Sequence, residues 1–494
     1  MAIKRYVANA DTTITNAYET NLTTRGTGSN MGQSDVSDVF SIYGQAASAS
    51  LESARILTKF NTTTISNDRD SGSIPASGSV SFYLRMYNAR HSQTLPNNFN
   101  LHVLALTRSW DEGTGLDMEG YTDLTHNDTG ANWENAQSGT NNWSTAGGDY
   151  YVDSSSSFTA SFSSGPEDME IDVTSLVEQW LNSAGNVLGS KTNYGVIIKF
   201  PDAEEAESKS YYTKKFFARG TEFWFKRPVI EARWDSSKKD NAGSFYLSSS
   251  LAAAAENLNK LYLYNNIRGR LRNIPDVGEK DILVSIYSGS TGPAGSKLML
   301  PFGAGVKAAA HVNVTGSYVS SGTYSASFAY ASSSITKIYP VWHSGTTEYH
   351  TGSAITVNTF DSVDYNPSPS YVTTITNLKE TYSTDEEARF RLYVRQKDWN
   401  PTIYTKAKSD PDNLIIEDAY YRIIRTIDDL DVVAYGTGSL DHNSTRLSYD
   451  VSGNYFDFSV SLLEKDYMYG IKLIYKLPNG FYKEQPHTFK FRVE

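Results

Sequence analysis

Tryptophan and acidic side chains gather in and beside a long stretch, from about Asp111 to Ser164, that is rich in Gly, Asn, Ser and Thr. An exposed indole can stack on a sugar ring while a carboxylate accepts hydrogen bonds from the sugar hydroxyls. A candidate glycan-binding site therefore consists of Trp110, Glu112, Trp133 and Trp143. The alternative, which we favour, is that Trp110 and Trp133 are buried supports for the loop, as large aromatic side chains usually are.

Four acids could supply oxygen ligands to a structural Ca²⁺: Asp11, Glu112, Asp117 and Asp123. The sequence has no twelve-residue EF-hand loop, and spacing does not assign ligands that are scattered over loops. We therefore assign no metal site and expect no cofactor. These acids, and those of the tract 202–207, are expected to be solvated.

Catalytic patterns are missing from the sequence. The eight histidines show no HExxH spacing, and there is no Gly-x-Ser-x-Gly elbow or P-loop. The absence of cysteine excludes disulfides, thiolate metal sites and cysteine nucleophiles. Since the fold, and not spacing, pairs the two acids of a glycosidase, a polysaccharide hydrolase stays as a third alternative. We expect no catalytic residues and no enzymatic activity.

Charge and hydropathy argue against a nucleic-acid-binding protein and against a membrane-spanning protein. The formal net charge of −11 argues against a nucleic-acid partner, which would require a basic surface. No stretch approaches the ~20 apolar residues of a membrane span, and no apolar run follows Lys4 and Arg5 as in a secretory signal. We expect no membrane insertion and synthesis in a cytoplasm, which also suits the lack of cysteine.

The elements that must position these residues are strands. Aromatic residues make up 13% of the 494 residues, and period-two alternation recurs along the chain. The sequence predicts an all-β protein with an N-terminal jelly-roll β-sandwich over 1–235 and two Ig-like or fibronectin-III-like β-sandwiches over 236–361 and 362–494. Representative predicted strands are Val36–Tyr43, Val80–Met86, Pro228–Trp234, Ala419–Arg425 and Tyr455–Leu462.

Two local patterns refine this prediction. A short helix is expected over Asp172–Trp180, capped by Asp172 or Thr174, with Leu176, Val177 and Trp180 on one face. Leu463 and Tyr469 have the spacing of a tyrosine corner, in which the hydroxyl bonds back to the backbone at the entry to a sandwich strand.

Segment 1–235 resembles the DNRLRE-type jelly-roll module, a family related to carbohydrate-binding modules. The literal signature that names the family is absent, but seven short motifs occur in the family's order. They are Asp11–Ile14, Asn30–Gly32 with Val39–Gly44, Ser53–Phe60, Ser109–Gly115, Ala131–Trp133, Asp172–Trp180 and Arg227–Ile230.

The C-terminal third resembles structural proteins of large contractile-tailed phages, in Trp399–Thr402, Arg446–Asp450 and Glu484–Glu494. The resemblance implies a structural component of a tailed-phage virion, in the neck or collar, the tail or attached to the head. Its expected partners are other virion proteins and further copies of itself, and its expected location is the virion. The alternative is a glycan-binding adhesin or fibre protein whose jelly roll attaches to host surface polysaccharide.

Overall fold

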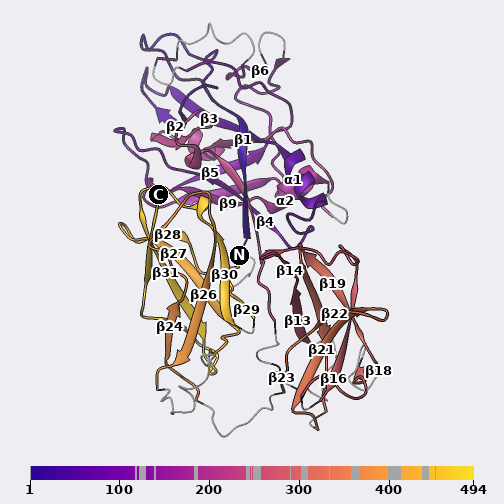
Figure 1. Ribbon diagram of the computed structural model, residues 1–494. Coiled ribbons are helices and arrows are strands. Elements are labelled where there is room, and N and C mark those ends of the chain that lie inside the picture. The colour runs from indigo at the N-terminus through magenta and orange to yellow at the C-terminus, as the bar shows by residue number, and fades with distance from the viewer. Residues whose placement is uncertain are drawn as a thin grey trace. The chain divides into compact units, whose positions relative to one another are not determined.

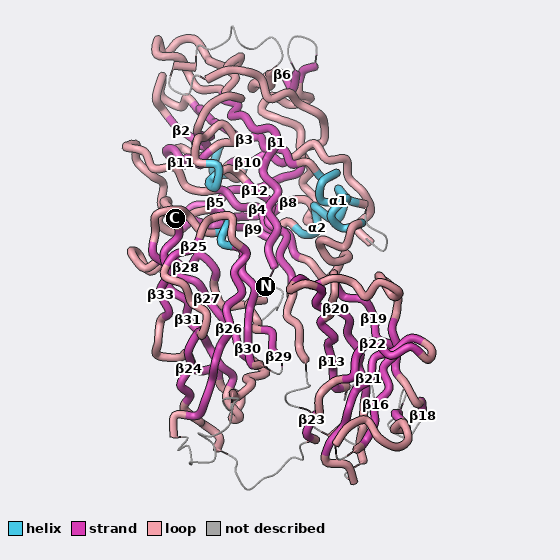
Figure 2. The backbone as a smooth tube through the Cα atoms, viewed as in Figure 1, coloured by secondary structure: helices cyan, strands magenta, loops and turns pink. Residues whose placement is uncertain are grey.

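The computed structural model describes the chain except residues 1, 117–119, 122–129, 138–140, 183–186, 241–244, 246, 249–257, 290, 302–309, 333, 358–365, 399–412, 437–443 and 451. Strands dominate the described residues and helices are few and short (Figure 2). The predicted fold class, a jelly roll followed by Ig-like sandwiches, is confirmed. The chain divides into two compact units, residues 2–235 and residues 236–494.

In the first unit a single long strand connects the two layers of a sandwich. Strand β1 (Ala2–Thr15) pairs through Ala2–Val7 with β12 (Val229–Trp234) and, beyond a bulge at Ala8–Ala10, with β3 (Leu51–Phe60). The strand order is β8-β5-β10-β3-β1-β12-β4-β9, with β2 beside β3 and β11 beside β2. The other strands are β2 (Val36–Tyr43), β4 (Ser81–Met86), β5 (Phe99–Ala105), β8 (Ser157–Phe162), β9 (Met169–Asp172), β10 (Val196–Lys199) and β11 (Tyr211–Phe217).

Two helices lie side by side at one edge of this unit (Figure 1). Helix α2 (Thr174–Leu181) confirms that a helix forms here, with Leu176, Val177 and Trp180 buried in the core. The predicted cap is wrong, because Asp172 ends β9 and the N-cap residue is Val173. Helix α1 (Thr62–Asp70) was not predicted, because a single buried side chain, Ile65, gives it almost no apolar periodicity. Asn61 caps α1 by accepting a hydrogen bond from the Thr63 amide at 3.0 Å.

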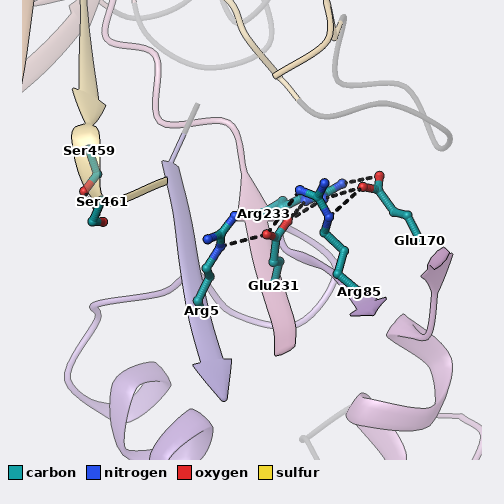
Figure 3. A network of polar contacts seen from close by, with 7 residues as sticks. All are labelled: Arg5, Arg85, Glu170, Glu231, Arg233, Ser459 and Ser461. Atoms are coloured by element: carbon teal, nitrogen blue, oxygen red, sulfur yellow. Dashed lines mark hydrogen bonds and ion pairs between the residues drawn. The ribbon is translucent and has the colours of Figure 1, made fainter. Parts of the chain in front are cut away.

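The face of β1, β12, β4 and β9 opposite the core carries a network of ion pairs (Figure 3). The fully buried Glu231 pairs with Arg233, with Arg5 at 2.9 Å and with Arg85 at 3.5 Å, while Glu170 pairs with Arg233 at 2.7 Å. Burial by itself raises the pKa of the Glu231 carboxyl, but the three guanidinium groups outweigh it and lower this pKa to about 2. Adjacent strands are thus held by charge as well as by the backbone ladder.

The second unit begins with a seven-stranded sheet among the described residues. The apolar face of this sheet contributes Val284, Ile286, Tyr324 and Trp342 to a buried hydrophobic core. The strands of the sheet are β13 (Asn259–Tyr264), β16 (Ile282–Ser288), β19 (Val314–Ser320), β20 (Thr323–Phe328), β21 (Lys337–Ser344), β22 (Thr347–Thr351) and β23 (Ile355–Thr356). Two short ribbons accompany it, β14 (Asn266–Ile267) with β15 (Arg270–Leu271) and β17 (Leu300–Pro301) with β18 (Ala310–His311).

The C-terminal part of this unit has two further sheets, in the orders β24-β26-β30-β29 and β25-β33-β31-β27-β28, with β32 beside β31. Their strands are β24 (Tyr371–Ile375), β25 (Thr381–Tyr382), β26 (Glu387–Gln396), β27 (Ala419–Arg425), β28 (Leu430–Val433), β29 (Ser448–Asp450), β30 (Gly453–Ser459), β31 (Met468–Lys476), β32 (Tyr482–Glu484) and β33 (Phe489–Val493). The predicted strand over Tyr455–Leu462 is too long, because Val460–Leu462 form the 3₁₀ turn η4.

The predicted boundary between the second and third domains falls within 358–365, outside the described residues. Across the proposed division, Lys239 forms a parallel bridge with Tyr449, and the amide of Asp240 donates to the Tyr449 carbonyl at 3.0 Å. Residues 238–240 therefore pair with the C-terminal part, although the sequence grouped them with the middle segment. The three-domain division stays a prediction.

The predicted tyrosine corner is confirmed. The buried Tyr469 hydroxyl donates to the Glu464 carbonyl at 3.0 Å and accepts from the Glu464 amide at 2.9 Å. Glu464 takes the position after Leu463 where proline is usual, and its amide makes a bond that proline would not allow.

Replacing Tyr469 by Phe removes both of these hydrogen bonds and leaves the Glu464 amide without its partner. We expect the free energy of unfolding of the chain to fall by about 1–3 kcal/mol. Thermal or urea unfolding measures this loss, and Tyr393→Phe is the control, since the Tyr393 hydroxyl has no hydrogen-bond partner among the described residues. Equal midpoints for the two variants would contradict the structural role of the corner.

Candidate functional site

The three candidate tryptophans of the long loop region lie inside the first unit. Trp110, Trp133 and Trp143 are 6%, 9% and 5% exposed and form one apolar cluster with Ile14, Leu57, Leu104, Leu106 and Ile197. The Trp110 indole N–H donates to the Tyr194 carbonyl and that of Trp143 to the Asn132 carbonyl, both at 2.8 Å. In this arrangement none of the three offers a ring face to a sugar.

The Trp133 ring is covered by the guanidinium of Arg55, which lies 4.8 Å from the ring centroid. Arg55 also donates to the Gly147 carbonyl at 2.7 Å and pairs with Glu205 at 2.5 Å. Glu205 belongs to the short helix α3 (Asp202–Glu205), and its side chain is 10% exposed. The prediction that the acids of 202–207 are all solvated is therefore wrong for Glu205, because two cations of the fold, Arg55 and Lys199, bind it.

Glu112 is paired within the protein. Its carboxylate accepts two hydrogen bonds of 2.8 Å from the Arg219 side chain and one of 2.9 Å from the Asp11 amide. This bidentate pair joins residues that are 107 positions apart and closes the loop region onto the segment that follows β11. A sugar hydroxyl would have to compete with Arg219 for the same oxygens.

Asp11 is 1% exposed, so the prediction that it is solvated is wrong. One of its carboxylate oxygens accepts a hydrogen bond of 2.5 Å from the Arg219 amide. Burial raises the pKa of the Asp11 carboxyl from 3.8 to about 7, and the nearby charge of Glu112 adds to the rise. The hydrogen bond from the Arg219 amide and the charges of Arg219 and Arg227 act in the opposite direction.

The buried carboxamide of Asn30 connects the segments around this cluster. Its NH₂ group donates to the carbonyls of Glu112 and Ala131, each at 2.8 Å, and its oxygen accepts from the amides of Gly32 and Gly115 at 3.1 and 3.0 Å. A β-carbon on Gly115 would lie 1.7 Å from the Asn30 carbonyl oxygen. The glycines of the Ser109–Gly115 motif therefore serve close packing on the Asn30–Gly32 motif.

The long stretch 111–164 was expected to be an unstructured loop. In the structure it contains β8 and the ribbon of β6 (Asn135–Gln137) with β7 (Asn141–Asn142). Its backbone is also bonded to its surroundings, for example from the Trp133 amide to the Thr27 carbonyl at 3.0 Å. The polar composition of the stretch hid these contacts from the sequence, although Phe158, Ala160 and Phe162 of β8 alternate with Ser and Thr.

The residues considered for a cation do not come together as a described site. Asp117 and Asp123 lie outside the described residues, and Asp11 and Glu112 are occupied as above. Within the described part of the chain no three His, Asp or Glu side chains are grouped to hold a metal ion. In the same part, no helix has the length and apolarity to cross a membrane.

Two other residues, Ser285 and Lys214, have surroundings that occur in catalytic sites. The Ser285 hydroxyl lies 2.8 Å from Nε2 of His343, a contact that activates serine in hydrolases, but both residues are buried. Burial lowers the pKa of the Lys214 ammonium to about 8. This ammonium donates to three oxygens, of Asn88, Gly165 and Glu167, at 2.6–2.7 Å, and so is bound internally.

An exposed aromatic turn escaped the sequence analysis. Trp224 is 54% exposed and Phe223 is 42% exposed, on the 3₁₀ turn η1 (Trp224–Lys226) and just before it. The side chain of Arg227 holds this turn by donating to the Thr221 carbonyl at 3.1 and 3.2 Å. The run Phe223-Trp224-Phe225 beside two basic residues was the available signal.

Comparisons with known proteins identify no family for this chain. No protein-family model and no curated protein sequence matches it. Among solved structures it is similar to native α2-macroglobulin of Escherichia coli (10% identity, 89% of this chain and 22% of that chain, TM-score 0.16). Others are Salmonella α2-macroglobulin reacted with methylamine (7% identity, 99% and 26%, TM-score 0.15) and the titin Z1Z2 domains in complex with telethonin (10%, 50% and 90%, TM-score 0.13). The chain spans about a quarter of the α2-macroglobulins or less, and these low scores carry no functional argument.

Replacing Trp133 by Ala distinguishes a buried support from a sugar platform. We expect a loss of about 3–5 kcal/mol in the free energy of unfolding, because the change empties a packed site beneath Arg55. The matched control is Trp224→Ala, whose ring is exposed and whose loss should change stability by about 0.5 kcal/mol or less. Unchanged stability of the Trp133 variant would contradict the packing role.

The raised pKa of Asp11 predicts a pH dependence of stability. Since the folded protein holds the Asp11 proton more tightly than the unfolded chain, this group stabilises the fold fully below pH ~4. That contribution is lost as the pH rises through about 7. Relative to Asp11→Asn, the wild-type free energy of unfolding should fall by on the order of 2–4 kcal/mol between pH 4 and 7. Urea titrations of both proteins at several pH values measure it, and parallel profiles would refute the raised pKa.

Proposed function

We propose that this chain is a structural component of a tailed-phage virion, in the neck or collar, the tail or attached to the head, and that it acts through protein–protein contacts. The virion location is supported by the resemblance of the C-terminal third to structural proteins of contractile-tailed phages. Other virion proteins and further copies of the chain are its proposed partners. The proposed jelly-roll relationship of residues 1–235 rests on the seven ordered motifs.

The proposed non-catalytic role in assembly depends on one observation. The residues best suited to bind a ligand, Trp110, Glu112 and Trp133, are committed to internal partners, so the loop region works as scaffold. Large sandwich units with internally paired charges present stable surfaces to neighbouring proteins. We propose that the chain is not an enzyme.

A second candidate function, the glycan-binding adhesin, is favoured by one observation. The exposed indole of Trp224 is held on a turn that Arg227 fixes, and a fixed, exposed ring can stack on a sugar without further ordering. If this candidate is right, the binding residue is Trp224, and the four residues proposed from the sequence serve as support.

Two measurements on the full chain separate these candidates. Quantitative mass spectrometry of purified particles should find the chain at a fixed copy number that survives washing in high salt. A glycan array should give no binding above background for the wild type. Binding that Trp224→Ala abolishes, together with absence from washed particles, would instead establish the adhesin.

A further inference from the structure

The arginine side chains of a basic hairpin in the second unit make no ion pair with the described residues of the chain. Strands β14 and β15 are joined by Arg268 and Gly269, both at positive φ, the geometry of a tight two-residue hairpin turn. Residues 265–274 contain three arginines, Arg268, Arg270 and Arg272, and no acid. All three are exposed, and none makes an ion pair or a side-chain hydrogen bond with the described part of the chain.

This lack of partners sets the hairpin apart from its surroundings. In the same unit Arg389 pairs with Asp457 at 2.6 Å, Arg391 with Asp450 at 2.8 Å, and Arg425 with Asp428 at 2.6 Å. The chain as a whole has 11 more acidic than basic residues. Three unpaired guanidinium groups on a short, fixed hairpin are therefore available to an acidic surface.

The hairpin forms one wall of a hollow of about 650 Å³. The hollow is lined by Ile267, Arg268, Arg270, Arg272, Asn273 and Ser321. The Ile267 side chain is 41% exposed, so the hollow combines three guanidinium groups with an apolar surface. It has no aromatic ring on which a nucleobase could stack, which disfavours a nucleic-acid strand.

The same chain carries a surface of complementary chemistry. The turn between β27 and β28 spans residues 426–429 and carries two acids, Asp428 and Asp429, and no base, while Asp431 follows within β28. Ile427 at its tip is 77% exposed. Asp429 makes no ion pair with the described residues, and the side chain of Asp428 is 43% exposed beside Arg425 and can accept further bonds.

We infer that the hollow at Arg268, Arg270 and Arg272 binds the Asp428–Asp429 turn of a second copy of this chain. Since these exposed arginines make no ion pair with the described residues, their guanidinium groups are available to the acids of another molecule. Ile427 packs against Ile267 as the carboxylates meet the guanidinium groups. Two different surfaces make the contact, so it is heterologous and builds a ring or a filament.

A contact between two turns buries little surface, so a single contact is weak and depends on salt. Several such contacts in a closed ring or on a particle reinforce one another through avidity. The inference rests on the proposed structural role, because it names the partner surface for self-assembly.

Sedimentation velocity of the purified full chain tests the inference. At about 50 mM salt the wild type should associate as its concentration rises, and about 500 mM salt should disperse it. Two variants reverse the charges of the two surfaces, R270E/R272E and D428K/D429K. The association of each with itself should be weaker than that of the wild type by about tenfold or more. Mixing them should restore association, because each reversed surface then meets its complement on the other variant.

The control is K483E/K490E, which reverses two exposed lysines elsewhere in the unit and should associate as the wild type does. Asp429→Lys alone replaces D428K/D429K if that variant fails to fold, since Asp429 makes no ion pair with the described residues that the change would remove. A wild type that is monomeric throughout, variants that associate normally, or a mixture that stays dispersed would each overturn the inference. Binding of an acidic polysaccharide by a monomeric wild type through the same arginines would assign the hollow to a glycan. Detection of the chain in washed particles is independent of these results, so a failure here leaves the virion role standing.

Discussion

The carboxamide of Asn30 is the interaction on which the first unit depends. With four hydrogen bonds it holds the backbone of its own turn, of the Glu112–Gly115 loop and of Ala131 in one place. Leaving any of these buried groups unpaired costs more than a hydrogen bond normally gains, so the segments order together. Trp110, Trp133 and the Glu112–Arg219 pair are held by the same arrangement. The residues that look most like a binding site are thereby used to build the scaffold.

The same logic extends to the other buried polar groups. The Glu231 carboxylate stays charged because three guanidinium groups surround it, and the Lys214 ammonium is enclosed by three oxygens. Such groups fix strand positions, but once satisfied they have little capacity left for ligands. Surfaces available for function are therefore exposed ones. In the described chain these include the Trp224 turn, where the rings of Trp224 and Phe225 contact each other and Trp224 stays exposed. They also include the arginine hairpin, which makes no ion pair with the described residues.

Much of the fold could be predicted from local patterns. Strands β2 and β27 match their predicted ranges because β-branched and aromatic residues are concentrated there. Helix α1 escaped because most of its residues are polar. Strand β8 escaped because it lies in a long polar stretch, although Phe158, Ala160 and Phe162 alternate with Ser and Thr. The contacts of the candidate site were harder to predict from the sequence. Burial of Trp133 was the favoured reading, but the partners of Glu112 and Arg55 lie 107 and 150 residues away, and no spacing rule connects them. Nothing in the spacing of the motifs Asn30–Gly32, Ser109–Gly115 and Ala131–Trp133 revealed that the Asn30 side chain joins them.

The hydrogen bonds and packing above make the described part of the loop region a rigid part of the scaffold. Residue-resolved hydrogen exchange of the full chain tests this rigidity at the amides of Gly32, Gly115, Ala131, Trp133 and Trp143. All five amides donate hydrogen bonds within the first unit. We expect them to exchange as slowly as amides in the central strands β1 and β3, and we expect Asn30→Ala to accelerate them together. Fast exchange in the wild type, at the rate of an open loop, would contradict it.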